Sequence, residues 1–352
     1  MRDVAIVGFA QVPNLRRGGG RDGVEMVLEV ANAVRTQTGL DKDEIGFTVS
    51  GSCDFLRGAP FAFVMALDGV GPFPPIAESH VEMDGAWALY EAWVRLQHGD
   101  IDTALVYCFG ISSAGDLPDV MTMQLDPYTV APLWPDAVSV AALQARALLD
   151  GGRYSERDMA EVASANRRRG QGNPYAHLTG DFDPEALLAD PYLVAPLRRH
   201  DCPPISDGAC AVILAAGDKA KACAERPAWI RGIDHRIDPH HLGSRDLTAC
   251  ASASLAAEAA GVGADKLDVV ELHAPFTHQE LILRDAMGID ADAVQLNPSG
   301  GALCANPIMV AGLTRLGEAA QRIMDGDADR AMAHATSGPA LQQNLVCVME
   351  GE

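Results

Sequence analysis

Four polar side chains have the chemical types needed to move a proton or to stabilise a developing negative charge. His273 follows a strand-like apolar run, and Asn306 directly precedes a proline. Glu82 stands just before a helical pattern, and His334 opens the run His-Ala-Thr-Ser-Gly-Pro. Carboxylates and imidazoles act as general acids and bases, whereas amide and imidazole N–H groups can bind an oxyanion.

Each of these residues also has a purely structural interpretation. A histidine beside or within a buried strand, such as His273 or His334, can be a hydrogen-bonded core residue. Glu82 can be a solvated carboxylate at a helix N-terminus, where the helix dipole favours negative charge. Asn306 can form a turn before Pro307. Residue type and spacing leave both interpretations open for all four positions.

Further candidates are His80 and Asp54, and Cys304, which stands two residues from Asn306 and is the type of small thiol that packs in cores. The pair Gly300-Gly301 permits a close backbone approach and unusual dihedral angles. Arg168 and Arg198 belong to two basic clusters in an acidic chain. These clusters are either solvated helix faces or contacts for a phosphorylated ligand.

The elements that must position these residues alternate along the chain. Apolar runs at 4–7, 45–51 and 103–109 predict strands, and periodic apolar residues at 23–38 and 86–96 predict helices. This alternation predicts an α/β protein with a largely parallel sheet.

The chain also repeats its own pattern at an offset of 222 to 227 residues. The run at 99–105 is echoed at 326–332, and two further runs repeat in the same order. This predicts two copies of one α/β unit. We expect an N-terminal half at 1–218, with a proline-rich inserted loop domain at about 113–200, and a C-terminal half at 219–352.

Composition excludes several classes of partner. The 352 residues carry 27 basic and 48 acidic side chains, a net charge of −21, which disfavours binding to nucleic acid or to anionic membranes. Eight cysteines lack paired metal-binding spacing, so we expect reduced thiols and no metal site. Without a long apolar segment, we expect a cytoplasmic protein.

Five runs in order along the chain resemble the thiolase superfamily, in its sterol-carrier-protein-x or lipid-transfer-protein branch. They are Val4-Ala-Ile-Val-Gly, Gly99-Asp-Ile-Asp-Thr-Ala-Leu-Val, Ser206-Asp-Gly-Ala-Cys-Ala-Val, Val270-Glu-Leu-His-Ala-Pro-Phe-Thr and Asn297-Pro-Ser-Gly-Gly-Ala-Leu. Further runs at 78–84, 127–136 and 334–346 resemble actinobacterial thiolase-like subunits of steroid side-chain aldol-lyases. The resemblance implies a duplicated five-layer αβαβα fold with an inserted loop domain.

The sequence departs from a thiolase at the reactive positions. The family's nucleophilic cysteine lies three residues before a glycine, and the corresponding residue before Gly85 is Glu82. The family's second cysteine is also missing from the region that begins at His334. Because Claisen chemistry needs a thiolate to carry the acyl group, these changes argue against thiolase activity. His273 occupies the position of the family's oxyanion-hole residue.

The resemblance therefore implies a carbon–carbon lyase. Such an enzyme cleaves a tertiary 3-hydroxyacyl-CoA of a steroid side chain into a ketone and a shorter acyl-CoA by retro-aldol chemistry. His273 and Asn306 would donate hydrogen bonds to the thioester enolate, with Glu82 or His334 as the base. Gly300 and Gly301 would lie against the thioester, and the clusters that contain Arg168 and Arg198 would bind coenzyme A phosphates. Coenzyme A is part of the substrate, and no separate cofactor is expected.

Two other functions stay open. The chain could be a non-catalytic subunit that supports a catalytic thiolase-like paralogue, because its six tyrosines all lie before residue 193, whereas related aldolases use tyrosines in the C-terminal half. It could also be an acyl-CoA thiolase or acyltransferase that carries the acyl group on Cys304. The expected partners are the steroid acyl-CoA, a second copy or a paralogue in a dimer or tetramer, and a small OB-fold, zinc-ribbon protein.

Overall fold

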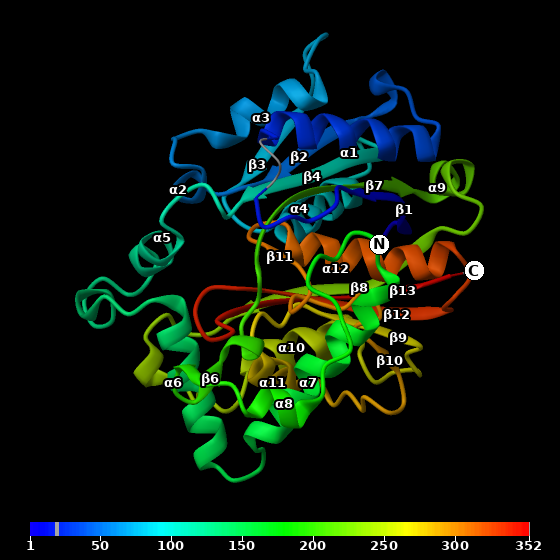
Figure 1. The fold of residues 1–352 in the computed structure, drawn as a ribbon. Helices are drawn as coiled ribbons and strands as arrows, with labels where there is room; N and C mark the ends of the chain where they lie inside the picture. The colour runs from blue at the N-terminus through cyan, green and yellow to red at the C-terminus, as the bar shows by residue number, and fades with distance from the viewer. Residues whose placement is uncertain (18–20, 352) are drawn as a thin grey trace.

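The computed structural model describes residues 1–17 and 21–351. A large sheet runs through the molecule in the order β10-β9-β12-β13-β8-β1-β7-β4-β2-β3, and the short strand β11 pairs with β7 (Figure 1). The strands are β1 (Val4–Gln11), β2 (Phe47–Gly51), β3 (Glu78–Val81), β4 (Thr103–Ile111), β7 (Ile205–Ala216), β8 (Ala228–Ile237), β9 (Val269–Leu272), β10 (Gln295–Leu296), β11 (Asn306–Pro307), β12 (Arg330–Ser337) and β13 (Gln343–Glu350). Two further strands, β5 (Tyr192–Val194) and β6 (Leu197–Arg198), form a separate ladder.

Helices form three layers around the two halves of this sheet. On one outer side lie α1 (Gly23–Thr38) and α3 (Ala62–Val70), and on the other lie α10 (Ala251–Ala260) and α11 (Thr277–Met287) (Figure 1). Between the halves lie α4 (Gly85–Gln97) and α12 (Ala311–Met324). The remaining helices are α2 (Asp54–Arg57), α5 (Leu117–Met123), α6 (Ala137–Asp150), α7 (Glu156–Arg169), α8 (Pro184–Leu188) and α9 (Gly217–Cys223). The α/β fold class and its αβαβα layering are confirmed.

The two halves of the sheet repeat one strand order. The first half reads β3-β2-β4-β7-β1, and the second reads β10-β9-β12-β13-β8. They meet where β1 pairs with β8 over two residue positions. Helices α5 to α8 all lie between β4 and β7, where the sequence predicts an insert. The division of the chain at residues 218 and 219 stays a prediction.

The expectation of a largely parallel sheet is wrong. Strands β2, β3 and β4 are parallel, as are β9, β10 and β12, but β7 runs antiparallel to both β4 and β1. Likewise, β13 runs antiparallel to β12 and β8. For β12 and β13 the reason is the connection: only residues 338–342 join them, and a link this short, with no crossover helix, makes an antiparallel pair.

The core between the two half-sheets holds α4 and α12 side by side. Its apolar cluster combines residues of both helices with inward-facing residues of both halves, such as Val106 and Ala333. Small residues let the chain approach closely here: a Cβ on Gly317 of α12 would lie only 2.1 Å from the ring of Phe9. This packing fixes the two helix N-termini next to each other. No helix in the described part of the chain is both long enough and apolar enough to cross a membrane.

Candidate active site

The sequence predicts that His273 and Asn306, which are 33 residues apart in the chain, act at one site. Their side chains are in contact in the structure. His273 lies directly after β9, where its backbone N–H donates to the His334 carbonyl of β12 at 3.2 Å. Asn306 starts β11, which pairs with β7, and its backbone N–H donates to Ser206 Oγ at 3.1 Å. The distance between His273 Nε2 and Asn306 Oδ1 is 3.0 Å.

The partners of the His273 ring assign its tautomer. Nδ1 faces the backbone N–H of Thr336 at 3.3 Å and must accept that hydrogen bond. The proton of the neutral ring is therefore on Nε2, which donates to Asn306 Oδ1. Burial lowers the pKa of His273 to about 4, so the ring is neutral near pH 7. With its oxygen engaged, the Asn306 amide still has its Nδ2 hydrogens to offer to a ligand.

Both residues line a cavity of about 360 Å³. Most of its wall is apolar and comes from α5, the start of α6, the prolines at 203 and 204, and residues 339–341. Its polar groups include Asp84, Ser112, Gln279 and Thr336, together with His273 and Asn306. A mostly apolar cavity with a few converging polar groups is typical of a binding site for a small organic molecule.

Asp84 is a cavity residue that the sequence analysis missed. It is only 2% exposed and forms the N-cap of α4, where its carboxylate accepts the Ala86 N–H at 2.9 Å. An aspartate directly before a predicted helix is a recognisable N-cap signal. Its place in the cavity wall could not be read from that signal, because the rest of the wall comes from distant segments.

Glu82 lies outside the cavity wall, in a separate cluster near β3. Its carboxylate accepts the Asp54 backbone N–H at 2.5 Å and lies 3.2 Å from His80 Nε2. His80 Nδ1 in turn lies 3.1 Å from Ser50 Oγ. The Glu82 side chain is 45% exposed. The structure thus brings the three candidates Glu82, His80 and Asp54 together, but none of them lines the cavity.

His334 also lies outside the cavity wall. Its side chain is fully buried in β12, with Nε2 2.9 Å from Asn344 Oδ1, and burial lowers the pKa of the ring to about 3. These contacts make it a neutral core histidine whose backbone carbonyl supports His273.

The residues predicted to lie against the thioester or to bind coenzyme A phosphates are likewise outside the cavity wall. Gly300 and Gly301 both have positive φ, of 93° and 64°, and a Cβ on Gly300 would lie 2.8 Å from Gly170 Cα. This turn therefore packs against the segment that follows α7. Arg168 is exposed and pairs with Asp181 at 2.8 Å, whereas Arg198 is buried and pairs with Glu156 at 2.5 Å.

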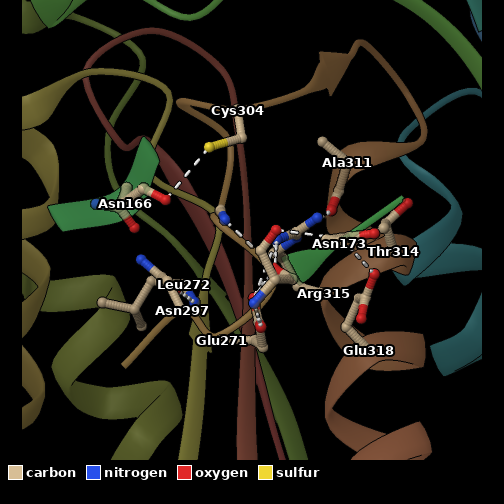
Figure 2. A network of polar contacts seen from close by, with 12 residues as sticks. Asn166, Asn173, Glu271, Leu272, Asn297, Cys304, Ala311, Thr314, Arg315 and Glu318 are labelled. Carbon is tan, nitrogen blue, oxygen red and sulfur yellow. Dashed lines mark hydrogen bonds and ion pairs between the residues drawn. The ribbon is translucent and has the colours of Figure 1, made fainter. Parts of the chain in front are cut away.

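A buried polar network supports the strand that carries His273 (Figure 2). Glu271 of β9 accepts the Ser299 N–H at 2.9 Å and the Arg315 Nη1 hydrogen at 3.0 Å. Asn297 Oδ1 accepts the Leu272 N–H at 2.7 Å. The network joins β9, the turn that contains Gly300, and α12, and it thereby fixes the position of His273.

The cysteines near the site are poor nucleophiles. Cys202 lines the cavity, and burial raises the pKa of its thiol to about 12. Cys304 lies outside the wall, with its pKa also raised by burial to about 12, and its Sγ faces the Asn166 carbonyl at 3.4 Å. Residues 1–17 and 21–351 contain no group of three or more His, Cys, Asp or Glu side chains arranged to hold a metal ion.

Known proteins resemble this chain in sequence and in fold. No protein-family model matches it. It is 30% identical over 149 residues to benzoylsuccinyl-CoA thiolase subunit BbsB of Thauera aromatica, a local match that covers 41% of this chain and 38% of that protein. It is 25% identical to acetyl-CoA acetyltransferase of Methanothermobacter thermautotrophicus over 380 residues, which covers 96% of this chain and 97% of that protein.

Among solved structures, the Ltp2-ChsH2(DUF35) aldolase has the same fold. It matches with a TM-score of 0.81 at 17% identity, covering 99% of this chain and 98% of that one. The acetyl-CoA acetyltransferase matches this chain in sequence from end to end, and the aldolase matches it in fold from end to end. Both matches agree with the duplicated layers described above. In sequence and in fold, the chain is similar to proteins of the thiolase superfamily.

Proposed function

We propose that this protein is an aldol-lyase, or an essential subunit of one, that cleaves a 3-hydroxyacyl-CoA with a tertiary hydroxyl into a ketone and a shorter acyl-CoA. The observation that carries this proposal is the His273–Asn306 contact in a largely apolar cavity whose one cysteine, among the described residues, has a raised thiol pKa. This arrangement provides hydrogen-bond donors for an enolate but no reactive thiolate for Claisen chemistry.

The proposed reaction breaks the bond between the α and β carbons of the substrate. A base takes the proton of the tertiary hydroxyl, its oxygen becomes the carbonyl of the ketone, and the electron pair of the broken bond moves into the thioester enolate. The Asn306 Nδ2–H group donates to the enolate oxygen, and His273 Nε2 holds the amide in that orientation. Protonation of the α carbon then gives the shorter acyl-CoA.

Several observations support the substrate class. Both sequence relatives named above act on acyl-CoA thioesters by their printed names, and the solved structure is named an aldolase. The apolar wall of the cavity suits a bulky hydrocarbon group, such as the side chain and adjoining rings of a steroid. We propose a steroid acyl-CoA on this basis.

We also propose that the chain works in an assembly. The name Ltp2-ChsH2(DUF35) describes two components, and this favours a complex with a partner protein. We propose that this partner is the small OB-fold, zinc-ribbon protein that the sequence resemblance implies. The assembly would also hold a second copy or a thiolase-like paralogue.

The test is to incubate the purified chain, alone and with its partners, with a steroid acyl-CoA that carries a tertiary 3-hydroxyl. Mass spectrometry would follow the ketone and the shortened acyl-CoA. Loss of an oxyanion donor in Asn306→Ala is expected to slow cleavage by roughly 10²–10³-fold. His273→Gln, which retains an N–H that can donate to Asn306, is expected to keep more activity than His273→Ala.

No cleavage under any condition would refute the proposal. Cleavage only in the mixture, unaffected by His273→Ala or Asn306→Ala, would assign the chemistry to a partner and a supporting role to this chain. A covalent acyl group on Cys202 or Cys304, detected by intact mass, would instead indicate acyl transfer.

A further inference from the structure

Asp84 joins the N-termini of the two central helices with a single carboxylate. Besides the Ala86 N–H of α4, it accepts the Gly312 N–H at 2.9 Å and the Leu313 N–H at 3.0 Å, both in the first turn of α12. The approach is so close that a Cβ on Gly312 would lie 2.4 Å from Asp84 Oδ1. The carboxylate is therefore held in one place by two separate elements.

This carboxylate keeps an unused acceptor position. A carboxylate has about four lone-pair positions, two on each oxygen. Oδ1 receives the N–H groups of Ala86 and Leu313, whereas Oδ2 receives only that of Gly312 within the described part of the chain. Asp84 also contributes to the wall of the cavity that contains His273 and Asn306. One acceptor position of Oδ2 is therefore not taken by these hydrogen bonds.

The environment of Asp84 suits a catalytic base, because the carboxyl is buried in the cavity wall, whereas a carboxyl that only caps a helix at the surface is exposed to solvent. Asp84 is 2% exposed, and burial raises the pKa of its carboxyl, although the three N–H groups and Arg315 act in the opposite direction. The two earlier candidates for the base lack such a position. Glu82 lies in the separate cluster near β3, and His334 is engaged with Asn344 outside the cavity wall.

We infer that Asp84 is the catalytic base that takes the proton of the tertiary hydroxyl, an assignment that rests on the proposed retro-aldol function. Oδ2 accepts the hydroxyl proton while the oxygen forms the carbonyl of the ketone and the bond between the α and β carbons breaks. The electron pair enters the enolate beside Asn306. Asp84 then returns the same proton to the α carbon, so the carboxylate is regenerated and no other reactant is consumed.

The test separates a basic role of Asp84 from its role as a helix cap. Asp84→Asn keeps the size of the side chain, and Asp84→Ala leaves space for a small anion. If Asp84 is the base, both variants lose cleavage by about 10²–10⁴-fold, the usual contribution of general acid–base catalysis. Added formate, a carboxylate that can act as a base, then restores part of the activity of Asp84→Ala. Nitrate, a planar anion of very low basicity, does not restore it.

The control is Asp22→Ala, which removes the N-cap side chain of α1, a helix that contributes no residue to the cavity wall. Asp22 accepts the Gly23 N–H at 2.5 Å, and its loss is expected to lower stability by about 1 kcal/mol while cleavage stays near that of the wild type. Circular dichroism and thermal unfolding of every variant would establish which of them are folded.

Three results would overturn the inference. Full activity in Asp84→Asn would show that no base is needed there, and equal rescue by nitrate and formate would show that the anion only repairs the helix N-termini. If a folded Asp84→Ala regained nothing with formate, Asp84 would be a structural cap. Failure of the proposed function has a different signature, because the wild-type protein and its assembly would then not cleave the substrate at all.

Discussion

Lowering the pH from 7 to 5 is expected to destabilise this protein through histidines that the fold keeps neutral. Burial lowers the pKa of His273 to about 4, and of His278 and His334 to about 3. In the unfolded chain a histidine has a pKa of about 6.5. Between that value and the folded value, the unfolded state binds a proton that the folded state does not, so the free energy of unfolding falls as the pH falls.

The size of this effect follows from linkage. Between pH 7 and pH 5, each such histidine removes about 2 kcal/mol from the free energy of unfolding. Buried carboxyls act in the opposite sense, because a raised folded pKa lets the folded state take up protons first; burial raises the pKa of Glu280 and Glu318 in this way. The total pH dependence is therefore a sum of opposing contributions, and one histidine must be isolated by substitution.

His334→Gln makes that separation. Glutamine can keep a hydrogen bond to Asn344 but cannot be protonated. The variant is expected to lose about 2 kcal/mol less stability than the wild type between pH 7 and pH 5. Any fixed cost of the substitution cancels in this difference.

Urea unfolding at pH 5, 6 and 7, followed by circular dichroism and tryptophan fluorescence, would measure the difference. His98→Gln, at an exposed position after α4, is the matched control and should unfold with nearly the same pH dependence as the wild type. If His334→Gln lost as much stability on acidification as the wild type, the reasoning that His334 is neutral because it is buried would be refuted.

Three further outcomes are expected. Gly312→Ala should lower the free energy of unfolding by about 1–3 kcal/mol, measured with urea, because its Cβ would collide with Asp84; unchanged stability would contradict the close approach of the two helices. Arg315→Met should cost about 3–5 kcal/mol, because it leaves Glu271 as a buried carboxylate without its cation; a neutral effect at pH 7 would count against this ion pair. Cys202 should resist brief alkylation by iodoacetamide at pH 8 in the folded protein, because its thiol has a raised pKa, and it should react once urea unfolds the protein. Peptide mass mapping would measure the labelling, and rapid labelling of Cys202 in the folded protein would contradict the raised pKa.

The sequence by itself determined the duplicated architecture. The repeated runs, and the periodic apolar residues at 23–38 and 86–96, are local properties of the chain, and the structure places α1 and α4 at these positions. The sequence also pointed to His273 and Asn306, because each ends or begins an element and carries a hydrogen-bonding side chain. The prediction of a largely parallel sheet was wrong, because strand direction depends on how the strands are connected and packed rather than on the residues of each strand.

Only the tertiary structure decided which polar residues share one cavity. Asp84 binds the N–H of Gly312, which is 228 residues away in the sequence, so no local pattern could reveal that it joins two helix N-termini. The tautomer of His273 is likewise set by the backbone of Thr336, 63 residues away. Burial and hydrogen-bond partners assign chemistry to these side chains, and both arise only when distant segments pack together.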